Sequence, residues 1–105
     1  METIKISEIF SDAPGGRYIE DGPKSGQEFR ETILLPRFEK LSGNEKLVID
    51  LDGCYGYATS FLEESFGGLA RECGIDEVLK KIELISHEEP RLVDEIIGYI
   101  KDAKK

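Results

Sequence analysis

The segment 46–53 constrains the fold of this chain more than any other. It reads KLVIDLDG, a continuous apolar run that ends in acidic residues and a glycine, and a helical pattern opens shortly afterwards at Ser60. A strand, a short loop and a helix in this order are typical of open α/β sheets, whose working surface lies at the carboxyl ends of the strands. Residues 47–51 are apolar on both faces except for Asp50, which predicts a central strand covered by helices on both sides.

Three further segments have strand patterns. Residues 3–7 alternate, residues 17–19 form a second strand in hairpin relation to the first, and residues 82–85 are mostly apolar. With helices beginning near Ser25, Ser60 and Pro90, the expected order is β-β-α-β-α-β-α. We therefore predict an α/β fold with a mixed sheet and packed helices, in one domain spanning residues 1–105.

Both internal helices begin with a capping-box pattern. Ser25 precedes Glu28 by three residues, and Ser60 precedes Glu63 by three, so each serine is expected to accept a hydrogen bond from the backbone amide of its glutamate. Pro36 interrupts the first helical pattern, so that helix is expected to end near residue 35 or to kink there.

Composition limits the function. Among the 105 residues, 22 are Asp or Glu and 14 are Lys or Arg, a formal net charge of -8 that argues against a nucleic-acid binder. No apolar run approaches the roughly 20 residues needed to span a bilayer, and no signal-peptide pattern appears, so we expect a cytoplasmic protein. Cys54, Cys73 and the single histidine, His87, are too few for a zinc site, and we expect neither metal nor cofactor.

Asp50 and Asp52 resemble the first motif of haloacid-dehalogenase-type phosphatases. In that family the first aspartate is the nucleophile, the second is the general acid, and Mg²⁺ is the cofactor. Only 55 residues follow Asp50, and no late strand ends in the acidic pair that such enzymes need to hold the metal. The simpler interpretation is that Asp52 and Gly53 turn the chain at a strand end.

The segment 15–26 is rich in glycine and contains two cations, and Arg30 follows it on the helix. Cations beside a helix start could bind a small anion or a nucleotide, although the spacing fits no established nucleotide motif. The candidate anion-binding residues are Arg17, Lys24, Ser25, Gly26 and Arg30. Turns with surface charges are the alternative interpretation.

Thr59 and Ser60 stand at the expected start of the second internal helix. The positive potential of a helix N-terminus favours a phosphate, so both residues are candidate phosphorylation sites. The simpler interpretation is that Ser60 only caps its helix.

The chain resembles a family of small STAS-like domains over nearly its whole length, roughly residues 4–103. The resemblance rests on four segments, namely Gly15-Gly16-Arg17-Tyr18, Ser25-Gly26 with Phe29-Arg30, Val48-Ile49-Asp50-Leu51-Asp52-Gly53, and Ser60-Phe61-Leu62-Glu63-Glu64-Ser65-Phe66-Gly67-Gly68-Leu69. Together these segments are fairly specific.

The resemblance implies the fold of anti-sigma-factor antagonists, which are not enzymes and dock onto a histidine-kinase-like ATPase. In those antagonists a serine of the loop after the central strand is phosphorylated by the partner. The matching positions here read Ala58-Thr59-Ser60-Phe61, so Thr59 is nearest to the phosphoacceptor. The resemblance therefore implies a regulatory interaction module, and its expected partner-binding residues are Tyr55, Tyr57, Thr59, Ser60 and Phe61.

Overall fold

A three-stranded parallel sheet organises residues 2–104, which are the residues that the computed structural model describes. Its strands are β1 (Glu2–Lys5), β2 (Leu47–Asp50) and β3 (Ile82–Ile85), and β2 lies between the other two. Ile4, Ile49 and Leu84 occupy the same row across the sheet. The predicted central position of β2 and the predicted strand at residues 82–85 are confirmed.

The predicted hairpin at residues 17–19 is wrong, and the sheet is parallel rather than mixed among the described strands. β1 ends at Lys5 and passes into a single helical turn, α1 (Ile6–Ile9), and the predicted hairpin segment leads into a 3-10 turn, η1 (Ile19–Asp21). The backbone of this segment bonds to residues 24–27 instead of β1. The amides of Gly26 and Gln27 donate to the carbonyl oxygens of Gly16 and Arg17, both at 2.9 Å.

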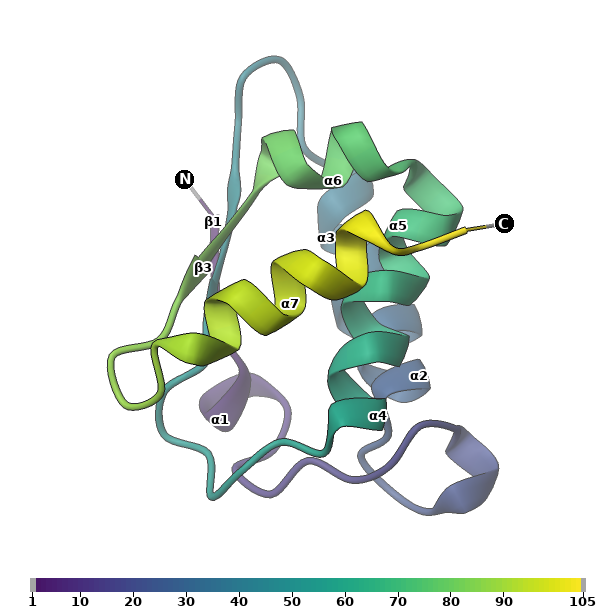
Figure 1. Ribbon diagram of the computed structural model, residues 1–105, viewed down its shortest axis with the longest axis vertical. Helices are drawn as coiled ribbons and strands as arrows, with labels where there is room; N and C mark the ends of the chain where they lie inside the picture. Colours follow the sequence, from purple (N-terminus) through teal and green to yellow (C-terminus); the bar gives the residue numbers. More distant parts are fainter. Residues whose placement is uncertain (1, 105) are drawn as a thin grey trace.

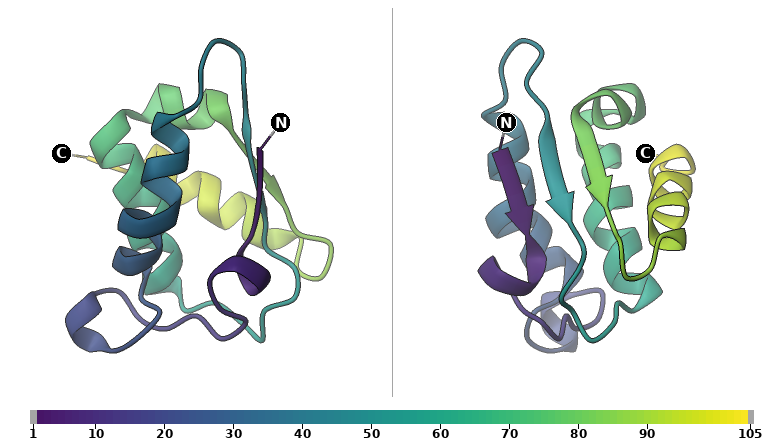
Figure 2. Two further views of the ribbon diagram at one scale, coloured as in Figure 1. Left: turned by 180° about the vertical axis from the view of Figure 1, so that it is seen from behind. Right: turned by 90° about the vertical axis from the view of Figure 1, so that its left-hand side faces the viewer.

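The long helices of the described chain lie on one face of the sheet (Figures 1 and 2). The prediction that helices cover both faces of β2 is therefore wrong. Val48 and Asp50 point to the opposite face, where Val48 lies in a row with Thr3 and Glu83. On that face Asp50 forms an ion pair with Lys5 at 3.7 Å. The strand looks apolar on both faces in the sequence because one valine, Val48, stands on its uncovered face.

The connection from β1 to β2 contains one continuous helical segment. It consists of α2 (Gly26–Phe29), a π-helical turn η2 (Arg30–Leu34) and α3 (Leu35–Glu39). Ser25 caps it as predicted, accepting a hydrogen bond from the Glu28 amide at 3.0 Å. Pro36 does not end the helix. The π-helical turn η2 lies just before it, and this wider turn accommodates a proline, which has no backbone N–H to donate.

The connection from β2 to β3 contains α4 (Thr59–Leu62), a second π-helical turn η3 (Glu63–Gly67), α5 (Gly68–Cys73) and α6 (Ile75–Lys81). Gly74, with φ of 100°, ends α5. The last helix, α7 (Arg91–Lys101), follows Pro90 and buries Ile96 and Ile100. No described helix is long and apolar enough to cross a membrane.

The core lies between the sheet and these helices. Phe29, Phe61 and Phe66 are fully buried there, and the rings of Phe29 and Phe61 stack with centroids 5.9 Å apart. Because Phe29 belongs to α2 and Phe61 to α4, this contact holds the two internal helices side by side.

Candidate functional site

The loops after β2 and β3 are joined at the carboxyl end of the sheet. The Asp52 carboxylate accepts hydrogen bonds from the backbone amides of His87 at 2.9 Å and Glu88 at 3.0 Å. Glu88 in turn accepts one from the Gly53 amide at 2.9 Å. The two amide bonds that Asp52 accepts, chiefly the one from Glu88, lower the pKa of Asp52. Asp52 therefore fixes one loop against the other.

A cleft of about 370 Å³ lies between these two loops and the start of α7, and we call it the loop cleft. Tyr55, Tyr57 and Thr59 line it from the loop after β2 and the first residue of α4. Glu88 and Glu95 line it from the other side. Its position at the carboxyl ends of parallel strands is the one expected for a working surface in an open α/β sheet.

The predicted partner-binding residues occupy different environments. Tyr55 is 89% exposed, and Thr59 is also exposed. Tyr57 is half-buried and its hydroxyl donates to the Leu51 carbonyl oxygen at 2.7 Å; burial raises its pKa. Phe61 is fully buried against Phe29, so its side chain is in the core and not on the predicted binding surface.

The predicted capping role of Ser60 is wrong. The helix begins at Thr59, Ala58 occupies the N-cap position, and no side chain caps the helix there. Ser60 is half-buried in the first turn. Of the two candidate phosphorylation sites, the exposed Thr59 is therefore the more accessible.

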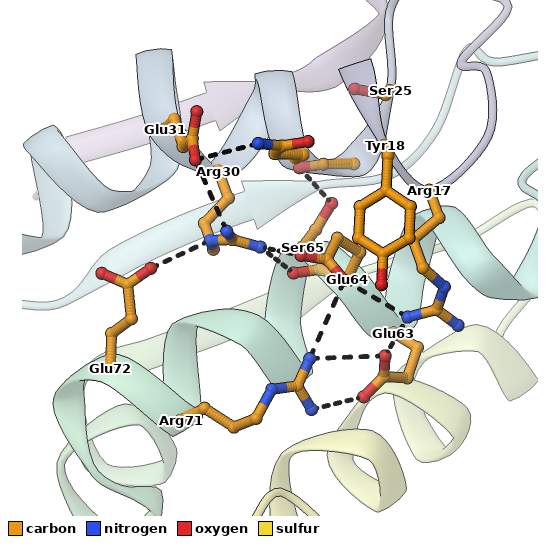
Figure 3. A network of polar contacts seen from close by, with 12 residues as sticks. Arg17, Tyr18, Ser25, Arg30, Glu31, Glu63, Glu64, Ser65, Arg71 and Glu72 are labelled. Atoms are coloured by element: carbon orange, nitrogen blue, oxygen red, sulfur yellow. Dashed lines mark hydrogen bonds and ion pairs between the residues drawn. The ribbon is translucent and has the colours of Figure 1, made fainter. Parts of the chain in front are cut away.

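The five predicted anion-binding residues do lie near one another, around the start of α2, but the guanidinium groups of Arg17 and Arg30 are paired with glutamates of the protein itself (Figure 3). Arg30, with a side chain only 10% exposed, bonds to the Glu64 carboxylate at 2.5 Å and to Glu72 at 3.1 Å. Arg17 pairs with Glu63 and, at 3.3 Å, with Glu64. We call these residues, together with Arg71, the arginine–glutamate cluster.

The positive charges of the cluster's arginines are paired with the negative charges of its glutamates. Arg71 contacts Glu63 at 2.7 Å, and this bond is the main reason that the pKa of Glu63 is lowered. The bond to Glu63 raises the pKa of Arg17. The cluster therefore joins the segment before η1 to η2 and to the helix of η3 and α5.

The other predicted anion-binding residues also have local partners. Lys24 has a positive φ of 61°, and its ammonium lies 5.1 Å from the centroid of the Phe10 ring. Ser25 is the helix cap described above. A Cβ on Gly26 would lie 2.6 Å from the Phe61 carbonyl oxygen, so this glycine allows α2 and α4 to approach closely.

Gly67 and Gly68 serve the same cluster. A Cβ on Gly68 would lie 2.5 Å from an Arg30 guanidinium nitrogen, and one on Gly67 would lie 2.6 Å from a Glu63 carboxylate oxygen. The space that these glycines leave is therefore filled by the ion pairs.

Asp50 and Asp52 do not face a common cation site. Asp50 lies beside Lys5, and Asp52 is bonded to the opposite loop. Residues 2–104 contain no group of three His, Cys, Asp or Glu side chains arranged to hold a metal ion.

Sequence reasoning missed the second wall of the loop cleft. Glu88, Arg91 and Glu95 follow β3, and none of them was among the predicted site residues. The parallel pairing of β2 with β3 was the signal that could have found them, because parallel neighbours bring their following loops to the same end of the sheet.

The comparisons with known proteins agree with the fold. The family described as "STAS-like domain of unknown function (DUF4325)" matches residues 25–92. No curated protein and no solved structure matches the chain. The matched segment runs from the Ser25 cap through β2 and β3 to the start of α7, and it contains every member of the arginine–glutamate cluster except Arg17. The chain therefore belongs to the STAS-like domain family of unknown function.

Proposed function

We propose that this domain is a non-enzymatic regulatory module that docks onto a histidine-kinase-like ATPase through the carboxyl end of its sheet. The proposal combines the family membership with the mode of action of anti-sigma-factor antagonists, whose fold this family resembles. The docking surface consists of α1, the turn at η1 and the loop between β2 and α4.

The distribution of exposed apolar side chains is the observation that carries this proposal. Among the described residues, the exposed large hydrophobic side chains are Ile9, Tyr18, Ile19 and Tyr55. They belong to α1, to η1 and its cap, and to the loop after β2, segments that all lie at the lower end of Figure 1. Apolar side chains gathered at one end of a small domain are typical of a protein-interaction surface.

The roles of the candidate charged residues also support a non-enzymatic module. The Asp52 carboxylate is bonded to backbone amides, and the guanidinium groups of Arg17 and Arg30 are paired with glutamates. These groups stabilise loops and helices, so phosphatase chemistry and anion sensing each require them to leave their present partners.

Thr59 offers a control point on this surface. It is exposed, begins the continuous helical segment 59–73 and lines the loop cleft. A phosphate there would add about -1.5 to -2 charges. It would also fill part of the cleft that a partner side chain has to enter. Phosphorylation of Thr59 would therefore weaken docking.

Calorimetric titration of the chain against a histidine-kinase-like ATPase encoded by a neighbouring gene tests the proposal. We expect saturable binding by the wild type and weaker binding by Tyr55→Ser and Thr59→Glu. Asn44→Ala, in the exposed loop at the opposite end of the molecule, is the control and should bind as the wild type does.

Circular dichroism of each variant reports folding. If the folded Tyr55→Ser, Thr59→Glu and Asn44→Ala proteins all bind with the same affinity as the wild type, the carboxyl end of the sheet is not the docking surface.

A further inference from the structure

The lining of the loop cleft carries a net negative charge that its internal ion pairs do not neutralise. Three glutamates, Glu88, Glu89 and Glu95, and one cation, Arg91, are among its lining residues. Glu89 pairs with Arg91 at 2.8 Å, and Glu88 accepts the Gly53 amide at 2.9 Å. Formally, three negative charges and one positive charge leave the lining at -2.

Glu95 is the unpaired carboxylate of this cleft. It lies on α7, is half-buried, and has no ion pair or hydrogen bond within residues 2–104. Its carboxylate is therefore free to pair with a cation that enters the cleft.

Aromatic rings on the opposite wall define the kind of cation. Tyr55 is 89% exposed, and Tyr57 is held in place by the bond from its hydroxyl to the Leu51 carbonyl oxygen. A guanidinium stacks on an aromatic face and pairs with a carboxylate through a planar fork, whereas an ammonium does so less well. A cleft with tyrosines on one wall and a glutamate on the other suits arginine.

We propose that the loop cleft takes an arginine side chain presented by a protein partner, with its guanidinium paired with Glu95 and stacked against Tyr55. This inference rests on the proposed docking function and names the chemistry of the partner. A protein is the favoured source because Tyr55, which lines the cleft, is also one of the exposed large hydrophobic side chains of the proposed docking surface. The net charge of -8 favours a basic partner segment in addition.

The test uses the isotope-labelled full chain and three acetylated, amidated tripeptides, Gly-X-Gly, in which X is arginine, lysine or citrulline. Citrulline has nearly the shape of arginine but no charge. We expect saturable shifts of backbone amide signals from residues 54–59 and 86–95 with the arginine peptide, weaker binding of the lysine peptide and none of the citrulline peptide.

Glu95→Gln should raise the dissociation constant of the arginine peptide about twofold to fivefold, the range for a partly exposed ion pair. Glu95→Lys should abolish the shifts. Glu83→Gln, on an exposed residue of β3, removes the same charge from the far face of the sheet and should bind as the wild type does. The dispersion of the amide spectrum shows whether each variant is folded.

Three results would each overturn the inference: no saturable shifts, equal binding of the citrulline peptide, or unchanged affinity of the arginine peptide for folded Glu95→Gln. Equal binding of the lysine peptide would overturn the choice of arginine. The two proposals fail separately. Peptide binding without ATPase binding would reject the partner class and keep the cleft, whereas ATPase binding that Glu95→Gln leaves unchanged would reject only the cleft.

Discussion

The arginine–glutamate cluster and the loop cleft use the same kinds of residue in opposite ways. In the cluster, the side chains of Arg30 and Glu64 are each 10% exposed and bonded to one another. In the loop cleft, Arg91 is 77% exposed in its side chain and Glu95 has no partner among the described residues. The difference separates charges that hold the fold together from charges that remain accessible to another molecule.

This comparison also explains why conspicuous motifs were poor guides to the site. Much of the resemblance to the family rests on the segments that supply Arg17, Gly26, Arg30, Glu64 and Gly68, and these residues form or border the cluster. These residues occur at these positions because two helices approach closely there. The resemblance predicted one wall of the loop cleft, which carries Tyr55, Tyr57 and Thr59, whereas the other wall is made by Glu88 and Glu95, which attract no notice in the sequence.

The largest expected effect comes from breaking the buried pair. Arg30→Met should lower the free energy of unfolding by about 3 kcal/mol, because it leaves Glu64 buried without its main partner. The loss is at the lower end of the usual range since Arg17 still lies 3.3 Å from Glu64. Arg91→Met in the cleft should change stability by less than about 0.5 kcal/mol. Urea denaturation of both variants makes the comparison.

The double variant Arg30→Met/Glu64→Leu separates charge from packing. It removes both ions, and we expect it to recover part of the lost stability. If Arg30→Met is no less stable than Arg91→Met, the cluster does not hold the helices together.

A smaller effect is expected at Gly26, where α2 and α4 approach closely. Gly26→Ala places a Cβ against the Phe61 carbonyl oxygen and should cost about 1–3 kcal/mol, the range for overpacking. Gly98→Ala is the matched control, since no atom lies within 4 Å of the Cβ position there. Gly98 is inside α7, so this change should stabilise the protein by about 0.5–1 kcal/mol. Thermal unfolding that shifts both variants in the same direction would contradict the packing assignment.

The sequence was informative where local signals agreed with the fold. β2, β3 and the Ser25 cap were all predicted, because apolar runs and capping residues act over a few residues. The hairpin failed because the segment before η1 satisfies its backbone by bonding to residues 24–27. The wall formed by Glu88 and Glu95 depends on a contact between loops more than 30 residues apart, for which no local pattern exists.

Ser25 and Ser60, the two predicted helix caps, allow a comparison of a smaller effect on stability. Ser25→Ala should lower stability by about 1 kcal/mol, because its buried hydroxyl accepts the Glu28 amide. Ser60→Ala should change stability by less than about 0.5 kcal/mol, since Ser60 is not the cap of its helix. Equal losses in chemical denaturation would show that Ser60 contributes a hydrogen bond that the structure does not contain.

The smallest expected effect concerns Asp52, the residue that joins the two loops of the cleft. Its pKa is lowered in the folded protein, chiefly by the Glu88 amide, so its stabilising contribution is present above the unfolded pKa of about 3.9. The contribution is lost as pH falls through the lower folded pKa. Asp52→Asn should therefore have a lower urea midpoint than the wild type at neutral pH, and this difference should shrink below about pH 4.

Asp12→Asn is the matched control for this pH series, because Asp12 is exposed and its carboxylate has no bond among the described contacts. Amide hydrogen exchange adds a local readout. In Asp52→Asn the amides of His87 and Glu88 should exchange faster at neutral pH, while those of Ile49 and Ile100 in the core should not. A difference between wild type and Asp52→Asn that persists undiminished at acidic pH would mean that the side chain acts through its shape rather than its charge, and that the loops of the cleft are held by other contacts.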